Sequence, residues 1–433
     1  MSASQSNLSA YYSLPAYTAE PRRGHEQRLL VHDPPNVPLS IPSPPRQWQD
    51  QFVKHSKSGG VTLKVYNQRS DVPFPTYHGG ANNSIRGCVD LAKTENVTCI
   101  DLKECLEGRL LLHEVAAGGA STTELCSQRI TLWTREHSLT DTGARQACQI
   151  SLPFTLNLPT TFSDEYGTYP LPPSFESNLP GLPGFHATIT YSLSVVANKS
   201  KSSLFSLGNP TLSTPLIYLP RSRPPTPSPP ALHPATFTPR LDSRSDWQAF
   251  TTMIKIKRPF KGASQDLEDI ESKLYLHTTR IFPITQSIPF YLSLLSSSSS
   301  LGVFMPFGPQ TQGSVGSSVF GVGGYQCTRM RLTRQVIVDA KNPNLRAQTA
   351  TIMWDMTTIG EGRFKLFNHG SDWITFYGEI PISSEVKVSG FKAAGLLVRD
   401  FLSLTMVPSD PAKSPFKEFH QTIPIRLTTD LWA

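Results

Sequence analysis

Long apolar runs are missing from this sequence of 433 residues. No stretch approaches the roughly 18 consecutive apolar residues of a membrane-spanning helix. The first ten residues are polar and uncharged, without the basic and apolar regions of a secretory signal peptide. We therefore expect a cytoplasmic protein.

Cysteine is scarce, and its spacing does not suit a metal. No two of the cysteines form a C-x-x-C pair, so we expect no metal site and no cofactor that depends on thiolates. In the reducing cytosol they would act as small apolar residues within strands. The six cysteines are Cys88, Cys99, Cys105, Cys126, Cys148 and Cys327.

Catalytic and nucleotide-binding motifs are also missing. The sequence has no G-x-S-x-G, H-E-x-x-H, P-loop or G-x-G-x-x-G. Its net charge of +7 comes from scattered Lys and Arg, without the basic stripe of a nucleic-acid binder. We predict a protein that is not an enzyme, needs no cofactor and binds no nucleic acid. The alternative, an enzyme on a sandwich fold, would require a deep pocket with convergent His and carboxylate groups.

Proline and short alternating apolar stretches are abundant. The 38 prolines exclude long helices, and alternation with a period of two is typical of half-buried strands. The fold class predicted is all-β, with two consecutive seven-stranded immunoglobulin-like β-sandwich domains. The expected strands are Val61–Gln68, Ser84–Ala92, Val97–Leu112, Ser127–Leu139, Ile150–Pro159, Gly184–Val196 and Thr214–Pro220, then Trp247–Pro259, Lys273–Ser296, Thr328–Ala340, Thr349–Gly360, Asp372–Ile382, Gly390–Val407 and Thr422–Trp432.

Composition places the boundaries between these parts. We expect a disordered Pro- and Ser-rich tail over 1–58, a first sandwich over 59–220, a linker or long excursion with seven prolines over 221–245, and a second sandwich over 246–433. Two shorter irregular segments are also expected. Leu171–Pro183 reads as a surface loop, and Ser296–Ser300 as a flexible hairpin loop.

Several stretches resemble those of one protein family. "SIRGCVDLA", "LPFTLNLP" and "LPPSFESNLPGLPGFHATITYSLSVV" are similar to successive strands of the arrestin N-domain, and "IPFYLSLLSS" and "FKAAGLLVRDFLSLTMVPSD" are similar to strands of its C-domain. In outline the match runs from Val61 to Trp432, and the chain most resembles the fungal arrestin-related (α-arrestin) group. The resemblance implies two arrestin-type sandwiches and a non-catalytic cytosolic adaptor. Such adaptors bring a HECT-type ubiquitin ligase to membrane transporters or receptors, through PY motifs that WW domains bind.

The sequence departs from that pattern in its motifs. It contains no P-P-x-Y, and the sequence ends directly after the last expected strand, without a long C-terminal tail. Leu14, Pro15, Ala16 and Tyr17 form an L-P-x-Y variant in the expected tail, where an extended segment would suit a WW groove. An accidental match is the alternative reading. A sorting scaffold of the retromer-associated type, which shares the fold and needs no PY motif, is the alternative function.

Two further sets of polar residues are candidates for binding or modification. Thr226 and Ser228 precede prolines beside two arginines, which suits phosphorylation, although the segment could equally be an unmodified linker. The second set comprises pairs of basic residues that lie on one face of a strand. They would contact phosphorylated cargo, or anionic lipid at the plasma or endosomal membrane. The alternative is that they are ordinary solvated surface residues. These pairs are Lys255 with Lys257 and Arg329 with Arg331.

Overall fold

The structure is a computed structural model of the chain. It describes residues 51–57, 60–69, 72–79, 84–91, 99–115, 120–134, 151–165, 167–199, 211–234, 237, 239, 246–257, 267–311, 326–340, 351–412 and 414–432.

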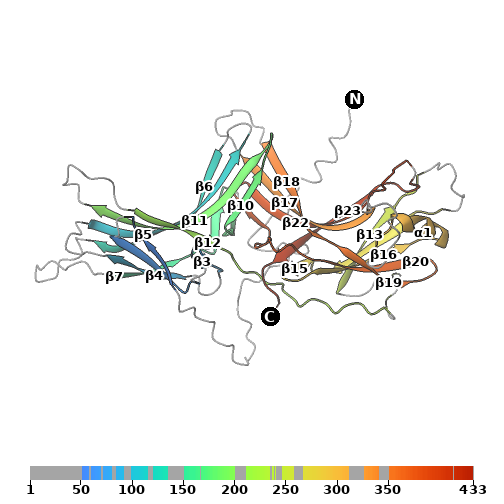
Figure 1. The fold of residues 1–433 in the computed structure, drawn as a ribbon, viewed down its shortest axis with the longest axis horizontal. Helices are drawn as coiled ribbons and strands as arrows, with labels where there is room; N and C mark the ends of the chain where they lie inside the picture. The colour runs from blue at the N-terminus through green and yellow to red at the C-terminus, as the bar shows by residue number, and fades with distance from the viewer. Residues whose placement is uncertain are drawn as a thin grey trace, which may run out of the picture.

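Two sheets make up the N-terminal sandwich, which we define as residues 51–218 (Figure 1). One sheet has the strand order β1-β2-β4-β7, and the other has β3-β12-β11-β5-β6, with β10 also paired to β11. A separate hairpin joins β8 to β9. The strands are β1 (Gln51–His55), β2 (Val61–Tyr66), β3 (Thr76–Tyr77), β4 (Ser84–Leu91), β5 (Cys99–Glu114), β6 (Ala120–Thr134), β7 (Ser151–Asn157), β8 (Thr161–Asp164), β9 (Gly167–Pro170), β10 (Phe175–Leu179), β11 (Phe185–Lys199) and β12 (Thr211–Tyr218).

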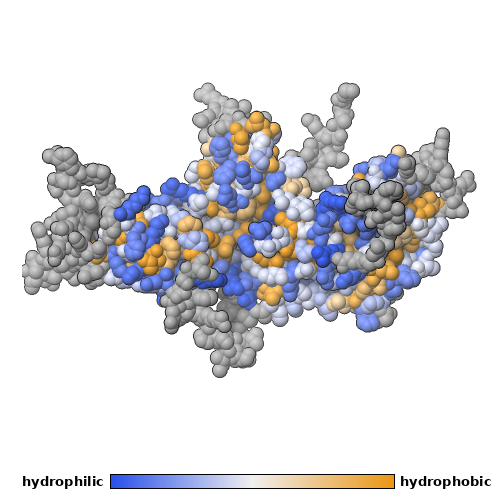
Figure 2. Space-filling model, in the orientation of Figure 1, coloured by the Kyte–Doolittle hydropathy of each residue, from blue (hydrophilic) through white to orange (hydrophobic). Residues whose placement is uncertain are grey.

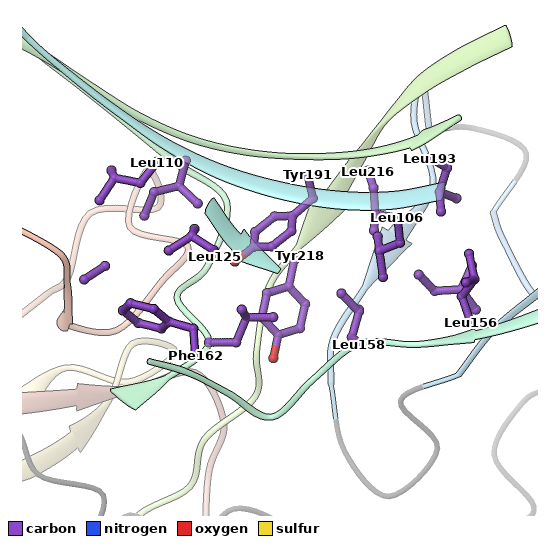
Figure 3. Close-up of a cluster of buried hydrophobic side chains, with 14 of the residues drawn as sticks. Leu106, Leu110, Leu125, Leu156, Leu158, Phe162, Tyr191, Leu193, Leu216 and Tyr218 are labelled. Carbon is purple, nitrogen blue, oxygen red and sulfur yellow. The ribbon is translucent and has the colours of Figure 1, made fainter. Parts of the chain in front are cut away.

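The core of this sandwich lies between its two sheets. Strand β7 alternates strictly, so Leu152, Phe154 and Leu156 are buried while their neighbours are exposed. From the opposite sheet, β11 contributes Tyr191 and Leu193, which are at most 1% exposed. Figure 3 shows side chains of both sheets in this layer. Each buried apolar side chain of this size contributes about 2 kcal/mol, which holds the sheets together.

Two further sheets make up the C-terminal sandwich, which we define as residues 247–428. Their strand orders are β13-β14-β16-β20-β19 and β15-β23-β22-β17-β18, with β21 also paired to β22. The elements are β13 (Trp247–Ile254), β14 (Ile270–His277), β15 (Ile281–Pro283), β16 (Ile288–Leu295), α1 (Ser298–Phe304), η3 (Met305–Phe307), β17 (Thr328–Ala340), β18 (Thr351–Glu361), β19 (Arg363–His369), β20 (Trp373–Ile380), β21 (Phe391–Ala393), β22 (Leu396–Met406) and β23 (Phe419–Thr428).

The two sandwiches share one strand order. The sheet β1-β2-β4-β7 matches β13-β14-β16-β20, and β3-β12-β11-β5-β6 matches β15-β23-β22-β17-β18. In each sandwich a very short strand pairs in parallel with the last strand, as β3 does with β12 and β15 with β23. The hairpin β8-β9 and the edge strand β19 are the additions that break this correspondence. The chain therefore contains the same topology twice in succession.

A continuous apolar core joins the two sandwiches. Strands of the C-terminal sandwich place buried side chains in the same cluster as the N-terminal core. The Phe175 ring of β10 meets the Phe391 ring of β21 edge to face, at 5.1 Å between centroids. In Figure 1, β6, β10 and β11 rise beside β17 and β18 to form a crest between the sandwiches. The C-terminal members of the cluster are Val336, Val338, Met353, Ala393, Leu396 and Val398.

The predicted surface loop over Leu171–Pro183 is wrong. Residues 171–173 are buried, and Phe175–Leu179 forms β10 in antiparallel register with β11. The buried Tyr191 hydroxyl donates a hydrogen bond of 2.6 Å to the Pro172 carbonyl oxygen. Proline lacks a backbone donor, but its carbonyl still accepts, so this segment can pack against the sandwich without a strand partner at 171–173.

Two other expected irregular segments are ordered. Gln51–His55 pairs with β2 as strand β1, so the predicted disordered tail does not extend to residue 58; residues 1–50 lie outside the described part. The predicted Ser296–Ser300 hairpin loop is the start of helix α1 instead. Ser297 caps it, because its side chain accepts a hydrogen bond from the Ser300 amide.

The described residues also contain more strands than the predicted seven for each sandwich. The five extra strands of the N-terminal sandwich, β1, β3, β8, β9 and β10, have two to five residues each. Such short strands carry too few residues for alternation to be read from sequence. In the C-terminal sandwich the expected single strand Lys273–Ser296 is divided into β14, β15 and β16.

Membrane insertion through a helix finds no support in the described residues. None of their helices has the length and the apolar composition that crossing a bilayer requires.

Replacing Tyr191 with Phe should lower the free energy of unfolding by about 1 kcal/mol, because the buried Pro172 carbonyl loses its donor while the ring packing is kept. Denaturant unfolding of both proteins measures the difference. Equal unfolding midpoints would contradict the structural role given to this hydrogen bond.

Candidate functional site: a clasp and a proline-rich strap

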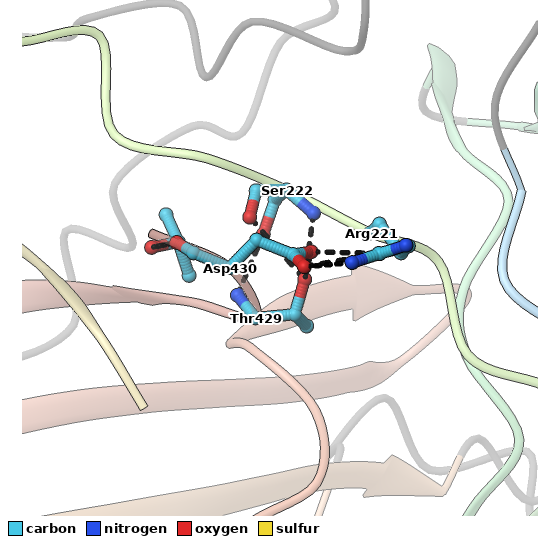
Figure 4. A network of polar contacts seen from close by, with 5 residues as sticks. Arg221, Ser222, Thr429 and Asp430 are labelled. Atoms are coloured by element: carbon cyan, nitrogen blue, oxygen red, sulfur yellow. Dashed lines mark hydrogen bonds and ion pairs between the residues drawn. The ribbon is translucent and has the colours of Figure 1, made fainter. Parts of the chain in front are cut away.

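Four polar residues join the exit of the N-terminal sandwich to the end of the C-terminal one. We call Arg221, Ser222, Thr429 and Asp430 the clasp (Figure 4). The Arg221 guanidinium forms an ion pair with the Asp430 carboxylate through Nε, at 3.0 Å to each oxygen, and through Nη2. The Ser222 amide donates to Thr429 Oγ1 at 2.8 Å, and the Asp430 amide donates to the Ser222 carbonyl at 2.9 Å. Residues 207 to 209 apart in sequence are thus held together.

The clasp changes the titration of its own groups. Burial alone would raise the pKa of Asp430, but hydrogen bonds from Arg221 and Thr429 outweigh it and hold that pKa below its ordinary value. The same bond raises the pKa of Arg221. The pKa of nearby His78 is lowered, first by burial and then by the charge of Arg221. The ion pair is therefore fully charged near neutral pH.

The segment after the clasp lies along the C-terminal sandwich. We call its described residues, 223–234, 237 and 239, the strap; it is the extended yellow-green coil in Figure 1. Leu232 and Phe237 are buried at 4% and 6% exposure. The described residues of the predicted linker or long excursion over 221–245 connect β12 to β13, and they contact the surface of the C-terminal sandwich on the way. The sequence does contain a signal for this packing, because two large apolar residues, Leu232 and Phe237, lie among the prolines.

Side-chain donors hold the strap by its proline carbonyls. Trp247 Nε1 donates to the Pro230 carbonyl at 3.3 Å, and the Tyr275 hydroxyl donates to that of Pro239 at 3.1 Å. Asn368 Nδ2 donates to the Pro234 carbonyl at 2.8 Å. Because proline has no backbone donor, these proline residues can be hydrogen-bonded only through their carbonyl oxygens.

Aromatic rings form the surface beneath the strap. Tyr275, Tyr291 and Tyr377 are direct cross-strand partners on β14, β16 and β20. The Phe237 ring of the strap packs edge to face on Tyr275 at 5.4 Å, and Trp247 packs on Tyr291 at 5.0 Å. The Tyr291 hydroxyl also accepts a 2.9 Å hydrogen bond from the Leu232 amide. We call the rings of the sheet, those of Trp247, Tyr275, Tyr291 and Tyr377, the aromatic groove.

An open pocket of about 340 Å³ lies where the strap meets the groove. Trp247, Tyr291 and Tyr377 line it from the sheet, and Pro229 lines it from the strap. Glu379 lies at the same pocket and accepts a hydrogen bond from the Tyr377 hydroxyl. Burial, and then this bond, raise the pKa of Tyr377, so Tyr377 remains the donor at neutral pH.

The basic pairs named from sequence are engaged with acids and carbonyls. Lys255 Nζ lies 3.0 Å from Asp269 Oδ2, and Lys257 Nζ donates to the Pro411 carbonyl. Glu361 Oε1 lies 4.0 Å from Nε of Arg329 and 3.7 Å from Nε of Arg331. The lysines follow β13 and the arginines lie on β17, two strands of different sheets.

The remaining named residues fall in two places. Thr226 and Ser228 are exposed on the strap. Leu14–Tyr17 lies outside the described residues. Within the described part, no group of three or more His, Cys, Asp and Glu side chains could hold a metal ion.

Comparisons leave the family of this chain open. No protein-family model matches the chain, and no curated protein is significantly similar to it. The arrestin resemblance remains a prediction from the stretches quoted above.

Replacing Asp430 with Asn should destabilise the protein by less than about 1 kcal/mol at pH 7, because Arg221 is half exposed and its charge is screened. Since the folded pKa of Asp430 is depressed, this stabilisation is present above the unfolded carboxyl pKa and is lost as pH falls through the folded value. Unfolding midpoints from pH 7 to pH 2 measure it. A constant difference between the two proteins over that range, or an equal effect of the exposed control Glu418→Gln, would contradict the role of the clasp.

Proposed function

We propose that this chain is a non-catalytic adaptor of the arrestin type, which acts in the trafficking or ubiquitination of membrane proteins from the cytosolic side. The observation that carries the proposal is the repeated strand order in two sandwiches that share one core. A pair of sandwiches joined by a shared core presents broad surfaces to partners. The sequence resemblance supplies the type of partner, namely the cytosolic tails of transporters or receptors.

The crest supplies a candidate surface for such tails. Ile352, Trp354 and Met356 alternate along β18 and are 43%, 52% and 49% exposed. β18 is the edge strand of its sheet in the described part of the chain. Figure 2 shows hydrophobic surface on the crest. An extended tail can add to a sheet edge through backbone hydrogen bonds and place its own apolar side chains on such a stripe.

The proposed ligase contact is the tail motif Leu14, Pro15, Ala16 and Tyr17, bound by a WW domain of a HECT-type ubiquitin ligase. Contact with anionic lipid at the plasma or endosomal membrane would use Lys255, Lys257, Arg329 and Arg331. Asp269, Glu361 and the Pro411 carbonyl must release these basic groups for that contact, so we expect it to be weak and sensitive to salt.

Replacing Tyr17 with Ala should abolish capture of the full-length protein by immobilised WW domains, because the Tyr side chain fills the second half of a PY-binding groove. The matched control is Tyr12→Ala, which changes a tyrosine of the same tail outside the motif. Undiminished capture of Tyr17→Ala would reject the ligase contact. Co-precipitation with a retromer-like complex in place of a ligase would identify a sorting scaffold.

Replacing Trp354 with Ala should leave the free energy of unfolding within about 0.5 kcal/mol, because half of the side chain is exposed. Proximity labelling of membrane transporters and receptors by the variant should fall several-fold, as removing a central aromatic anchor typically costs about 2 kcal/mol of binding. Leu366→Ala, on β19 and 53% exposed, is the matched control. Equal labelling by wild type and Trp354→Ala would exclude the crest as the cargo surface.

A further inference from the structure

Hydrogen bonds hold the strap on both sides of Thr226 and Ser228. The clasp holds Ser222, and the first bond to the aromatic groove is made by the Pro230 carbonyl. Thr226 and Ser228 lie between these points, are exposed, and make no hydrogen bond to the described part of the chain. Each is followed directly by a proline. An exposed, extended Ser-Pro or Thr-Pro is the substrate form that proline-directed protein kinases accept.

The charges around the two hydroxyl groups differ. Ser228 precedes Pro229, which lines the pocket together with Glu379. Thr226 lies two residues closer to Arg223, whose buried Nε has no hydrogen-bond partner. In an extended segment with a rise of about 3 Å per residue, Thr226 is about 9 Å along the strap from Pro229. A phosphate on Ser228 would therefore lie directly next to the residue that lines the pocket with Glu379, whereas one on Thr226 would lie about 9 Å farther back along the strap.

We propose that Ser228 is a phosphorylation site and that a phosphate there releases the strap from the aromatic groove. The transfer joins Ser228 Oγ to the γ-phosphorus of ATP while the bond from that phosphorus to the β–γ bridging oxygen breaks. ADP leaves, and the hydroxyl proton is released. The product carries close to two negative charges at neutral pH.

Release follows from charge and hydration. The dianion is repelled by Glu379, and its hydration shell competes with close packing of Pro229 and Pro230 on the groove. The part of the strap next to Ser228 is bound by the neutral hydrogen bonds of the Pro230 carbonyl and the Leu232 amide, each worth about 1 kcal/mol, so release begins at this part. The far end is held more firmly, by the buried Phe237 ring and by the hydrogen bond from Lys273 Nζ to the Pro239 carbonyl. Release would expose the Trp247 and Tyr291 rings, which the strap partly covers. This inference is independent of the adaptor proposal, because it concerns only the strap and the sheet beneath it.

The test begins with the folded full-length protein. A proline-directed kinase and ATP are added, and modified residues are mapped by mass spectrometry, with the denatured protein as reference. We expect Ser228 to be modified in both forms. Modification of Ser228 in the denatured protein alone would overturn the proposal.

The second step installs phosphoserine at 228 or phosphothreonine at 226 during synthesis. Hydrogen–deuterium exchange then follows the peptide that contains Leu232, whose amide is bonded to Tyr291. We expect exchange to accelerate about five- to tenfold with phosphoserine at 228 and less than about twofold with phosphothreonine at 226. Unchanged exchange in β14 verifies that the sandwich remains folded. Equal acceleration from both positions, or none from either, would overturn the proposal.

Glu379→Gln tests the cause of release. The glutamine oxygen can still accept from the Tyr377 hydroxyl, so the groove keeps its shape while the negative charge is removed. We expect this variant to at least halve the effect of phosphoserine at 228 on exchange. An undiminished effect would contradict repulsion by Glu379 and with it the proposed mechanism.

Discussion

One apolar layer connects the two sandwiches, and most of the remaining structure depends on it. Val338, Leu396 and Val398 of the C-terminal sandwich are fully buried in the cluster that also forms the N-terminal core. Separating the sandwiches would expose these side chains to water, at a cost of about 2 kcal/mol for each. The shared core therefore holds the end of β12 close to the end of β23, and the clasp residues that follow these two strands contact each other.

The strap is a consequence of that geometry combined with proline chemistry. The chain must pass from β12 to β13, and it does so along a sheet whose outer face carries tyrosine and tryptophan. Seven prolines leave the segment with acceptors and few donors. The sheet supplies the missing donors from Trp247, Tyr275 and Asn368. Aromatic faces and proline rings then fill the space between, so the strap covers the part of the outer face around Tyr275 and Tyr291.

Prediction from sequence succeeded where a local pattern carries the information. Alternation over Ser151–Asn157 identifies β7 and its buried face, because one face of this strand lies against the core and the other faces water. It failed for β10 and for α1. The strand β10 has five residues and is ordered by its partner β11. The helix α1 is short and serine-rich, and besides the Ser297 cap it is held by the Ser300 hydroxyl, which accepts a hydrogen bond from the distant Glu268 amide. In both, a contact with a separate segment contributes, and propensity does not consider it.

The candidate site, too, was predictable from sequence only in part. Sequence alone determined the all-β class, the strands with clear alternation and the presence of Thr226 and Ser228 before prolines. Only the tertiary structure decided that Leu232, Phe237 and Pro239 are bound to the sheet, and that Arg221 meets Asp430 from 209 positions away. It also decided that Glu379 and Pro229 line the same pocket. The physical reason is that periodicity reports which face of a strand is buried, whereas the partner of a proline carbonyl or a guanidinium is chosen by the fold that brings distant segments together.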